Sequence, residues 1–157
     1  MNMNFEAAVK KMFDMLGNSK IMALATSKND HVFVRNVSCV FYDNKIYFKT
    51  DKNFRKTKQL LENPQVAICW DGIQVEGIAV NKGLVIEEEG RRFEEAYRKY
   101  LWGSYNAYSH VDTEILIEIT PKFVEIWDQD SDKRGFQTFL DFDKQSVEVV
   151  YYDDKAD

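Results

Sequence analysis

Residues 35–64 have the sequence RNVSCVFYDNKIYFKTDKNFRKTKQLLENP, which predicts two strands, a tight hairpin and a short helix. The first strand covers 31–42, and an Asp-Asn pair turns the chain into the second strand, 45–50. The helix is expected from about 54 to 62, because an Asn-Pro pair then stops it. Strands joined by a two-residue turn favour an antiparallel sheet.

An arginine stands in the middle of an apolar strand face. Alternation along 31–42 places on one face Phe33, Arg35, Val37, Cys39 and Phe41. A guanidinium there is costly unless an anion or a hydrogen-bond acceptor meets it. The alternative is an arginine that extends to water or pairs with a carboxylate. The strand alone does not separate the two interpretations.

The charges of the following helix are reversed. With Asn53 as the expected N-cap, Arg55 and Lys56 fall in the first turn and Glu62 near the last. The helix macrodipole favours the opposite arrangement by roughly 0.3–1 kcal/mol per charge. An external anion such as phosphate would explain the reversal, because free N–H groups and two cations then act together. A solvated basic face that includes Lys58 is the alternative.

The rest of the chain extends the same pattern. Further strands are expected over 21–26, 66–70, 73–87, 114–120, 122–127 and 147–152, with a break at Pro121. Helices are expected over 1–17 and 93–101, loops over 102–108 and 131–135, and a frayed tail over 153–157. Hairpin-ordered strands with few helices predict a mainly β antiparallel barrel with flanking helices, in one domain of residues 1–157.

Composition and charge exclude several classes of partner. The net charge is -5, so neither nucleic acid nor an anionic membrane is an expected partner. Neither a signal peptide nor a membrane span is recognised, which favours the cytoplasm. Cys39 and Cys69 are expected to be buried free thiols. His31 and His110 stand alone, so no metal site is expected.

Several short motifs together resemble one known family. They are Leu24-Ala25-Thr26, Arg35-Asn36-Val37, Tyr47-Phe48-Lys49-Thr50, Arg55-Lys56 and Leu60 to Pro64. In this order and spacing the chain from Ile21 to Trp127 resembles the pyridoxamine 5'-phosphate oxidase-like family. The resemblance implies a split β-barrel that forms a homodimer and binds FMN at the interface, with residues from both subunits.

The resemblance also implies which residues bind FMN. Arg35 and Lys56 would approach the phosphate, with Arg55 beside it. The backbone along the flavin would come from Val37, Ser38 and Cys39, and the border of the ring or ribityl chain from Phe48, Lys49 and Thr50. Gln74 and Trp127 would reach the site from the partner subunit. An exposed strand glutamine and a core tryptophan are the alternative interpretations of that last pair.

The sequence departs from the family pattern at two places, which indicate the branch of the family that it resembles most. Phe54 stands where the family frequently has a serine that contacts the phosphate. The vitamin-B6 oxidases carry an R-x-H motif after their late tryptophan, whereas Trp127 is followed here by Asp128-Gln129-Asp130-Ser131-Asp132. This acidic run would repel a phosphorylated pyridoxine. The chain is therefore more similar to the general stress and nim-like branch than to the true vitamin-B6 oxidases.

The function implied is that of an FMN-dependent oxidoreductase acting on an unknown small molecule, with a nicotinamide as one candidate electron donor. Flavin supplies the redox chemistry in such proteins, and no catalytic residue is identified in the sequence. One alternative is a split-barrel protein that binds flavin or haem for sensing, without turnover. Another is a dimeric scaffold without a cofactor, which Phe54 would suit.

Overall fold

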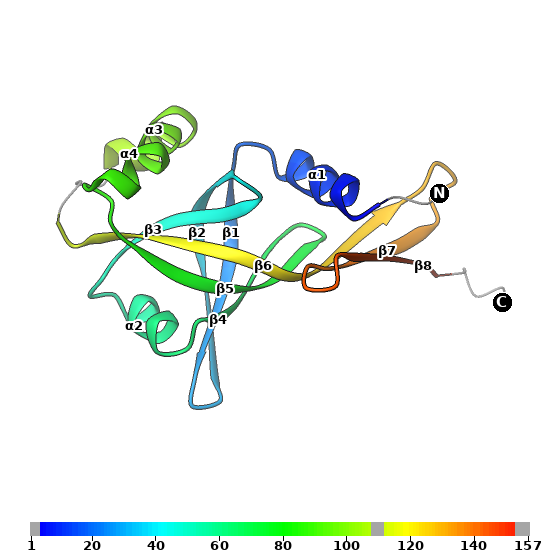
Figure 1. Ribbon diagram of the computed structural model, residues 1–157, viewed down its shortest axis with the longest axis horizontal. Coiled ribbons are helices and arrows are strands. Elements are labelled where there is room, and N and C mark those ends of the chain that lie inside the picture. The colour runs from blue at the N-terminus through cyan, green and yellow to red at the C-terminus, as the bar shows by residue number, and fades with distance from the viewer. Residues whose placement is uncertain (1–3, 108–111, 153–157) are drawn as a thin grey trace.

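The computed structural model describes residues 4–107 and 112–152. Its eight-stranded antiparallel sheet has the order β3-β2-β1-β4-β5-β6-β7-β8 (Figure 1). The strands are β1 Ser19–Lys28, β2 His31–Tyr42, β3 Lys45–Asp51, β4 Gln65–Trp70, β5 Ile73–Leu84, β6 Glu114–Gln129, β7 Gly135–Asp141 and β8 Ser146–Tyr151. The helices are α1 Phe5–Leu16, α2 Arg55–Glu62, η1 Glu88–Gly90, α3 Arg91–Tyr100 and α4 Trp102–Ala107. The tail 153–157 and His110 lie outside the described residues.

Pairing between β3 and β6 closes the first six strands into a barrel. Residues 46–51 of β3 lie opposite residues 119–114 of β6. Two-residue turns with positive φ join the hairpins at Asn29-Asp30 and Asp43-Asn44, as the sequence pattern predicts. The expected mainly β architecture, an antiparallel barrel with flanking helices, is confirmed.

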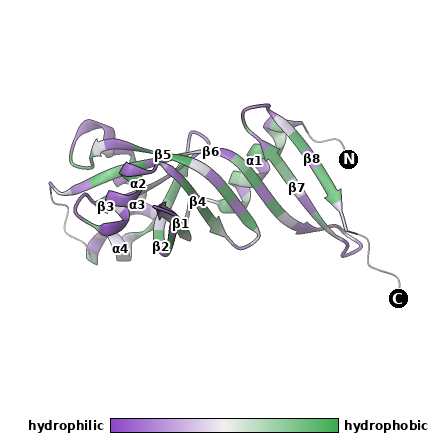
Figure 2. Cartoon of the chain, turned by 90° about the horizontal axis from the view of Figure 1, so that it is seen from below, coloured by the Kyte–Doolittle hydropathy of each residue, from purple (hydrophilic) through white to green (hydrophobic). Residues whose placement is uncertain are grey.

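Alternating side chains fill the barrel interior, and the strands show alternating hydrophobic and hydrophilic colours (Figure 2). The buried residues of the main core include Met22, Leu24, Val37, Cys39, Ile46, Phe48, Ile68, Val75, Ile117 and Ile119. Met12 and Leu16 of α1 join this cluster. A smaller cluster seats α3 on the outside of the barrel and consists of Val40, Tyr47, Val85, Phe93, Tyr97 and Leu116.

The predicted break at Pro121 is wrong, because β6 runs unbroken from Glu114 to Gln129. Pro121 lies opposite Gly77, and the next pair is Phe123 with Glu76. Lys122 is therefore an extra residue, and the register shifts at this point. A bulge tolerates a residue that cannot donate an N–H to the ladder, so proline bends the strand without ending it.

The second half of β6 carries a hairpin that the sequence prediction captured only in part. Residues 123–129 of β6 pair with β7, and β7 pairs with β8. Figure 1 shows this hairpin extending away from α2 and α3, on the same side as α1. The last strand was expected, but β7 was not. Its apolar residues, Phe136, Phe139 and Leu140, do not alternate with polar ones, so the strand lacks the usual signal.

Three further expectations are corrected. The aromatic stretch after Leu101 forms α4 over residues 102–107 and is not a loop. Cys69 is exposed, because Val66 and Ile68 take the core-facing positions of β4 and Cys69 points outward. The N-cap of α2 is Phe54, one residue later than predicted.

Within residues 4–107 and 112–152, no helix combines the length and apolar character that crossing a membrane requires.

Candidate functional site

A fork between β2 and β3 opens one side of the barrel. The two strands pair only from Val40 to Tyr42 of β2, after which β3 continues along β6. From His31 to Cys39, β2 pairs with β1 on one edge, and no described strand pairs with its other edge. That edge presents backbone donors and acceptors, which need a partner such as water or a ligand.

A pocket of about 340 Å³ lies in this fork. Its lining residues are Asn36, Val37, Ser38, Lys49, Thr50, Asp51, Phe54, Lys56, Tyr97 and Glu114. Val37 and Cys39 are buried in the core, so alternation turns Asn36 and Ser38 outward toward the pocket. Backbone and polar side chains of β2 therefore form one wall, and the ends of β3 and β6 form another.

Helix α2 begins at this pocket without a side-chain cap. Phe54 makes no capping hydrogen bond, and the first turn contains no acidic residue. The helix is fixed to the end of β3 by two contacts: Thr57 Oγ1 donates to the Asp51 carbonyl at 2.7 Å and lies 3.0 Å from Thr50 Oγ1. Thr50 thus positions the helix start, where free N–H groups favour an anion.

Arg35 extends from the core-facing side of β2 toward α2. Its Nη1 donates to Thr26 Oγ1 at 2.8 Å and to the Leu24 carbonyl at 3.2 Å. Its Nη2 donates to Gln59 Oε1 at 3.3 Å, and Gln59 also accepts from Thr26 at 2.7 Å. Neutral acceptors therefore hold the guanidinium in place without cancelling its charge. Of the two interpretations of Arg35 in the strand pattern, the structure supports a contact with hydrogen-bond acceptors.

Three cations gather at the helix start without a carboxylate to neutralise them. Among the ion pairs of the described residues, none involves Arg35, Arg55 or Lys56. Burial lowers the pKa of Arg35, and the nearby Arg55 lowers it further. Burial likewise lowers the pKa of Lys56, with Arg35 as the second cause. The cations destabilise one another, and an anion bound among them would relieve this repulsion.

Lys49 lies in the same pocket but is neutralised. Its ammonium group lies 3.1 Å from Glu94 of α3 and 3.2 Å from Glu114 of β6, and its side chain is only 5% exposed. The ring of Tyr97 lies 4.8 Å from the same Nζ atom. Lys49 therefore ties α3 to the barrel and brings Tyr97 to the pocket wall, and its charge is already compensated.

The protomer brings some of the predicted residues together and separates others. The fork pocket is lined by five of the predicted residues, Val37, Ser38, Lys49, Thr50 and Lys56. Arg35 lies near Lys56 but does not line the pocket, and the side chains of Cys39 and Phe48 lie in the core. Arg55 turns the other way, with its guanidinium 4.1 Å from the ring of Phe33. Gln74 lies on the outer face of β5, and Trp127 lies on β6 against Tyr152. Neither of these two lines the fork pocket.

Five pocket residues were not singled out from the sequence: Asn36, Asp51, Phe54 as a lining residue, Tyr97 and Glu114. The alternation that buries Val37 would have identified Asn36 as outward-facing. Tyr97 and Glu114 come from segments distant in sequence, and no local pattern connects them to β2 and β3.

Comparison with known proteins identifies the family. Residues 8–128 match the family model described as pyridoxamine 5'-phosphate oxidase. The chain belongs to this family. The match contains the whole barrel and the fork pocket, and it confirms the resemblance inferred from the short motifs. No curated protein is significantly similar to the chain in sequence.

Solved structures show the same fold at low sequence identity. General Stress Protein 26 of Bacillus anthracis has a TM-score of 0.63 and 20% identity, covering 86% of this chain and 98% of that one. A pyridoxamine 5'-phosphate oxidase-related, FMN binding protein of Nostoc punctiforme has a TM-score of 0.59 and 14% identity, covering 98% and 100%. HutZ, the haem storage protein of Vibrio cholerae, has a TM-score of 0.58 and 16% identity, covering 76% and 92%.

Proposed function

We propose that the chain binds FMN in the fork between β2 and β3 and acts as a flavin-dependent oxidoreductase. The observation that carries this proposal is that Lys56 and the neighbouring Arg35, which form no ion pair among the described residues, lie at the start of α2, where the N-cap makes no side-chain hydrogen bond, beside the edge of β2 that no described strand pairs with. A phosphate suits the cations and the free N–H groups. A flavin ring with several hydrogen-bonding atoms suits an unpaired strand edge.

The residues present fit this cofactor. Lys56 and Arg35 would hold the phosphate, with Arg55 adding charge next to them. The backbone of 37–39 would hydrogen-bond the flavin, and Thr50 keeps α2 in place at the pocket. Bound flavin supplies hydride and electron transfer, while the protein binds and orients the reactants and limits water access. Phe54 places an exposed ring at the position where, by the resemblance, the family frequently has a serine hydroxyl group.

The substrate is proposed to be a small molecule other than pyridoxine phosphate. The acidic segment after Trp127 contains Asp128, which pairs with Lys11, and Asp130, which accepts from Arg134. Both carboxylates are therefore paired with cations, and the proposal rests on the sequence after Trp127, which is Asp128-Gln129-Asp130-Ser131-Asp132 instead of the R-x-H motif that the vitamin-B6 oxidases carry. A reduced nicotinamide is the proposed electron donor.

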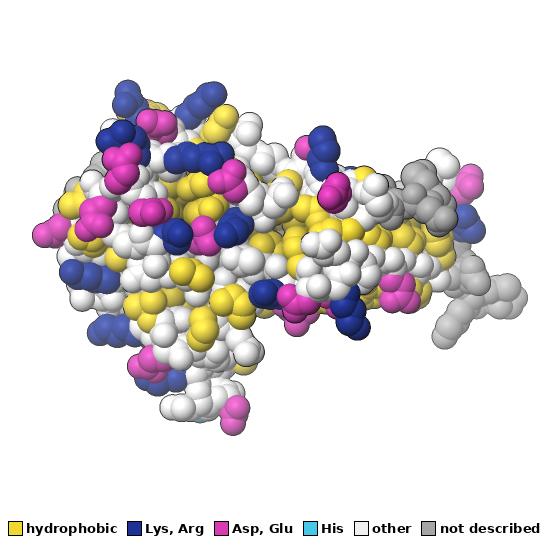
Figure 3. Space-filling view, in the orientation of Figure 1, with side chains coloured by type: hydrophobic (Ala, Val, Ile, Leu, Met, Phe, Trp, Pro, Cys, Tyr) yellow, Lys and Arg dark blue, Asp and Glu magenta, His cyan; other side chains and the backbone are white. Residues whose placement is uncertain are grey.

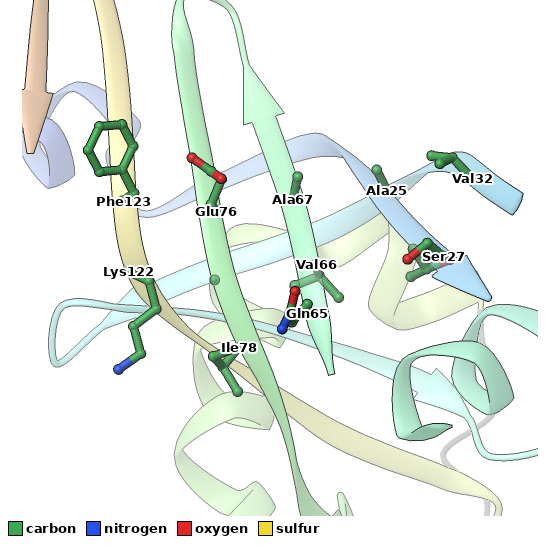
Figure 4. Close-up of a pocket in the computed structure, with 12 residues that line it drawn as sticks. Ala25, Ser27, Val32, Gln65, Val66, Ala67, Glu76, Ile78, Lys122 and Phe123 are labelled. Carbon is green, nitrogen blue, oxygen red and sulfur yellow. The ribbon is translucent and has the colours of Figure 1, made fainter. Parts of the chain in front are cut away.

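We also infer that a second copy completes the site. The outer face of β1, β4 and β5 is hollowed and lined mostly by apolar residues, with Glu76 and Lys122 among them; Figure 4 shows Ala25, Ala67 and Glu76 on neighbouring strands there. Val32 and Val34 of β2 lie at this face and are 73% and 69% exposed. Apolar surface of this kind marks interfaces. A homodimer across it would let the partner supply Gln74 and Trp127.

The dimer is tested by the mass in solution. Wild-type protein is expected to have twice the mass of the 18.4 kDa chain. Val34→Glu places a charge in the apolar face and is expected to give monomers, whereas Lys144→Glu, on the β7–β8 turn, is expected to leave the dimer intact. A monomeric wild type, or a Val34→Glu variant that remains dimeric, would contradict this assignment.

The cofactor is tested by titrating protein into FMN and following flavin fluorescence. Lys56→Ala is expected to weaken FMN binding roughly 10- to 100-fold, which corresponds to the loss of a hydrogen bond to a charged group. Lys58→Ala, an equal charge change on the same helix, is expected to leave FMN affinity nearly unchanged. Riboflavin, which lacks the phosphate, should bind wild type and Lys56→Ala equally. Equal losses of FMN and riboflavin would refute the phosphate assignment.

A binding or sensing protein without turnover is the second candidate. Two observations support this candidate: the chain shares its fold with the haem storage protein HutZ, and Phe54 stands at the proposed phosphate site. The absorption spectrum separates the cases, because flavin and haem absorb differently. A flavin spectrum that bleaches when NADH or NADPH is added supports the oxidoreductase. A stable flavin spectrum with both donors, or a haem spectrum, supports the second candidate.

A further inference from the structure

A second hollow, of about 490 Å³, lies across the start of α2 from the fork pocket. Its lining residues are Lys28, Asn29, His31, Phe33, Asn53, Arg55, Lys58 and Gln59. The tip of the β1–β2 hairpin forms one wall and the first turns of α2 form the other. The two pockets share no lining residue, so this hollow is a separate feature.

The hollow is positively charged in a protein whose net charge is -5. Lys28, Arg55 and Lys58 line it, and no carboxylate does. Lys28 is paired with Glu62 at 2.8 Å. No carboxylate of the described residues forms an ion pair with Arg55 or Lys58. On the surface over α3, acidic and basic side chains are intermingled (Figure 3). The second hollow differs from that surface because only cations line it, and it therefore attracts anions.

The same hollow contains a row of flat groups. The rings of His31 and Phe33 are stacked, with centroids 6.5 Å apart and planes 18° from parallel. The guanidinium of Arg55 lies 4.1 Å from the Phe33 ring. Nucleobases stack on aromatic rings and on arginine planes. Asn29 and Asn53 add amide donors and acceptors, which suit the edge of a base or the hydroxyl groups of a ribose.

Arg55 and Lys56 are neighbours in sequence but line different hollows, one on each side of the helix start. A pyrophosphate that bridges them would place one half of a dinucleotide in the fork and the other half in the second hollow. We propose that the second hollow binds the adenosine-phosphate half of a dinucleotide, with phosphate at Arg55 and Lys58 and the base against the His31–Phe33 row. This proposal rests on the fork as the flavin site.

Two sources could supply that chemistry: a dinucleotide form of the flavin, or the nicotinamide donor. FMN and FAD affinities of the full chain distinguish them, together with calorimetric titration of ADP-ribose into FMN-saturated protein. Lys58→Glu and His31→Ala change exposed residues of the hollow. Lys144→Glu, on the opposite part of the fold, is the control with the same charge change.

We expect either FAD to bind more tightly than FMN, or ADP-ribose to bind the FMN-loaded protein. Lys58→Glu should weaken that interaction by about tenfold, because it replaces an attraction with a repulsion. Neither variant should change FMN affinity by more than about twofold. A preference for FAD that disappears in Lys58→Glu assigns the flavin dinucleotide as the source. Equal FAD and FMN affinities with ADP-ribose binding assign the donor.

The proposal is overturned if wild type shows neither a preference for FAD nor ADP-ribose binding. It is also overturned if Lys58→Glu and His31→Ala have no effect, or if Lys144→Glu has the same effect as Lys58→Glu. Failure of the proposed function looks different: wild type would not bind FMN at all. ADP-ribose titrated into that unloaded protein would still report on the second hollow.

Discussion

Replacing Lys49 by methionine tests the electrostatics of the fork pocket most directly. The lysine is nearly buried between Glu94 at 3.1 Å and Glu114 at 3.2 Å, with the Tyr97 ring beside it. Methionine keeps most of the apolar stem and removes the charge. The two carboxylates, with side chains 20% and 13% exposed, would then both lose the ammonium group that they contact.

Removing one partner of a buried ion pair costs about 3–5 kcal/mol. Because both glutamates retain some contact with water, we expect about 2–3 kcal/mol for Lys49→Met, at or below the lower end of that range. Thermal unfolding should shift by roughly 5–10 °C for a chain of this size. Lys45, which pairs with Glu118 but is more exposed, provides the control, and Lys45→Met should cost less than about 1 kcal/mol.

Urea unfolding of Lys49→Met and of the triple variant Lys49→Met/Glu94→Gln/Glu114→Gln gives the decisive comparison. The triple variant should recover most of the lost free energy of unfolding, because it leaves no uncompensated charge. A single variant within about 0.5 kcal/mol of wild type would refute the ion-pair reasoning. FMN affinity should also fall less in Lys49→Met than in Lys56→Ala, and the reverse order would show that Lys49 binds the phosphate.

Three further outcomes are expected. In urea unfolding, Gly90→Ala should cost more than about 2 kcal/mol, because the new Cβ would lie 2.2 Å from a backbone oxygen, whereas Gly103→Ala meets no atom within 4 Å and should gain about 0.5–1 kcal/mol. Burial opposes ionisation of Glu118, but hydrogen bonds from a lysine and a tyrosine outweigh burial and lower its pKa. The stability that this carboxylate gives is present above the ordinary glutamate pKa of about 4.3 and is lost as the pH falls through the lower folded-state pKa, so Glu118→Gln should flatten the acid side of a stability–pH curve. Burial raises the pKa of the Cys39 thiol, so in the monomer expected from Val34→Glu a thiol reagent should modify Cys69, on the outer face of β4, and should modify Cys39 only after unfolding; early modification of Cys39 would contradict this.

Local patterns in the sequence were sufficient to predict most strands and turns of the barrel. Alternation along β2 placed Arg35 on the face of Val37 and Cys39, and the structure has it there. The Asp-Asn turn and the Asn-Pro stop also lie where local backbone preferences put them. These features depend on residues close in sequence, which is why a single chain reveals them.

Features that depend on distant segments were not predictable in the same way. Glu114 lies 65 residues from Lys49, and nothing near Lys49 signals that a carboxylate neutralises it. The continuity of β6 through Pro121 depends on Gly77 of another strand, which accommodates the bulge. Gln74 and Trp127 stay apart from the fork within one protomer, so their assignment depends on an assembly that the sequence implies only through its family.

The fork brings together three features that are each unfavourable alone. β3 leaves β2 because Phe48 and Thr50 continue along β6, and the edge of β2 from His31 to Cys39 then has no partner among the described strands. The contact between Thr50 and Thr57 aims the uncapped start of α2 at that edge. Lys56 and Arg35, which repel each other, lie at the same helix start. A single anionic ligand with hydrogen-bonding atoms satisfies the unpaired edge, the helix start and the cations at once. Because real proteins depart from local rules mainly at functional sites, this coincidence argues for a binding site more strongly than any one motif does.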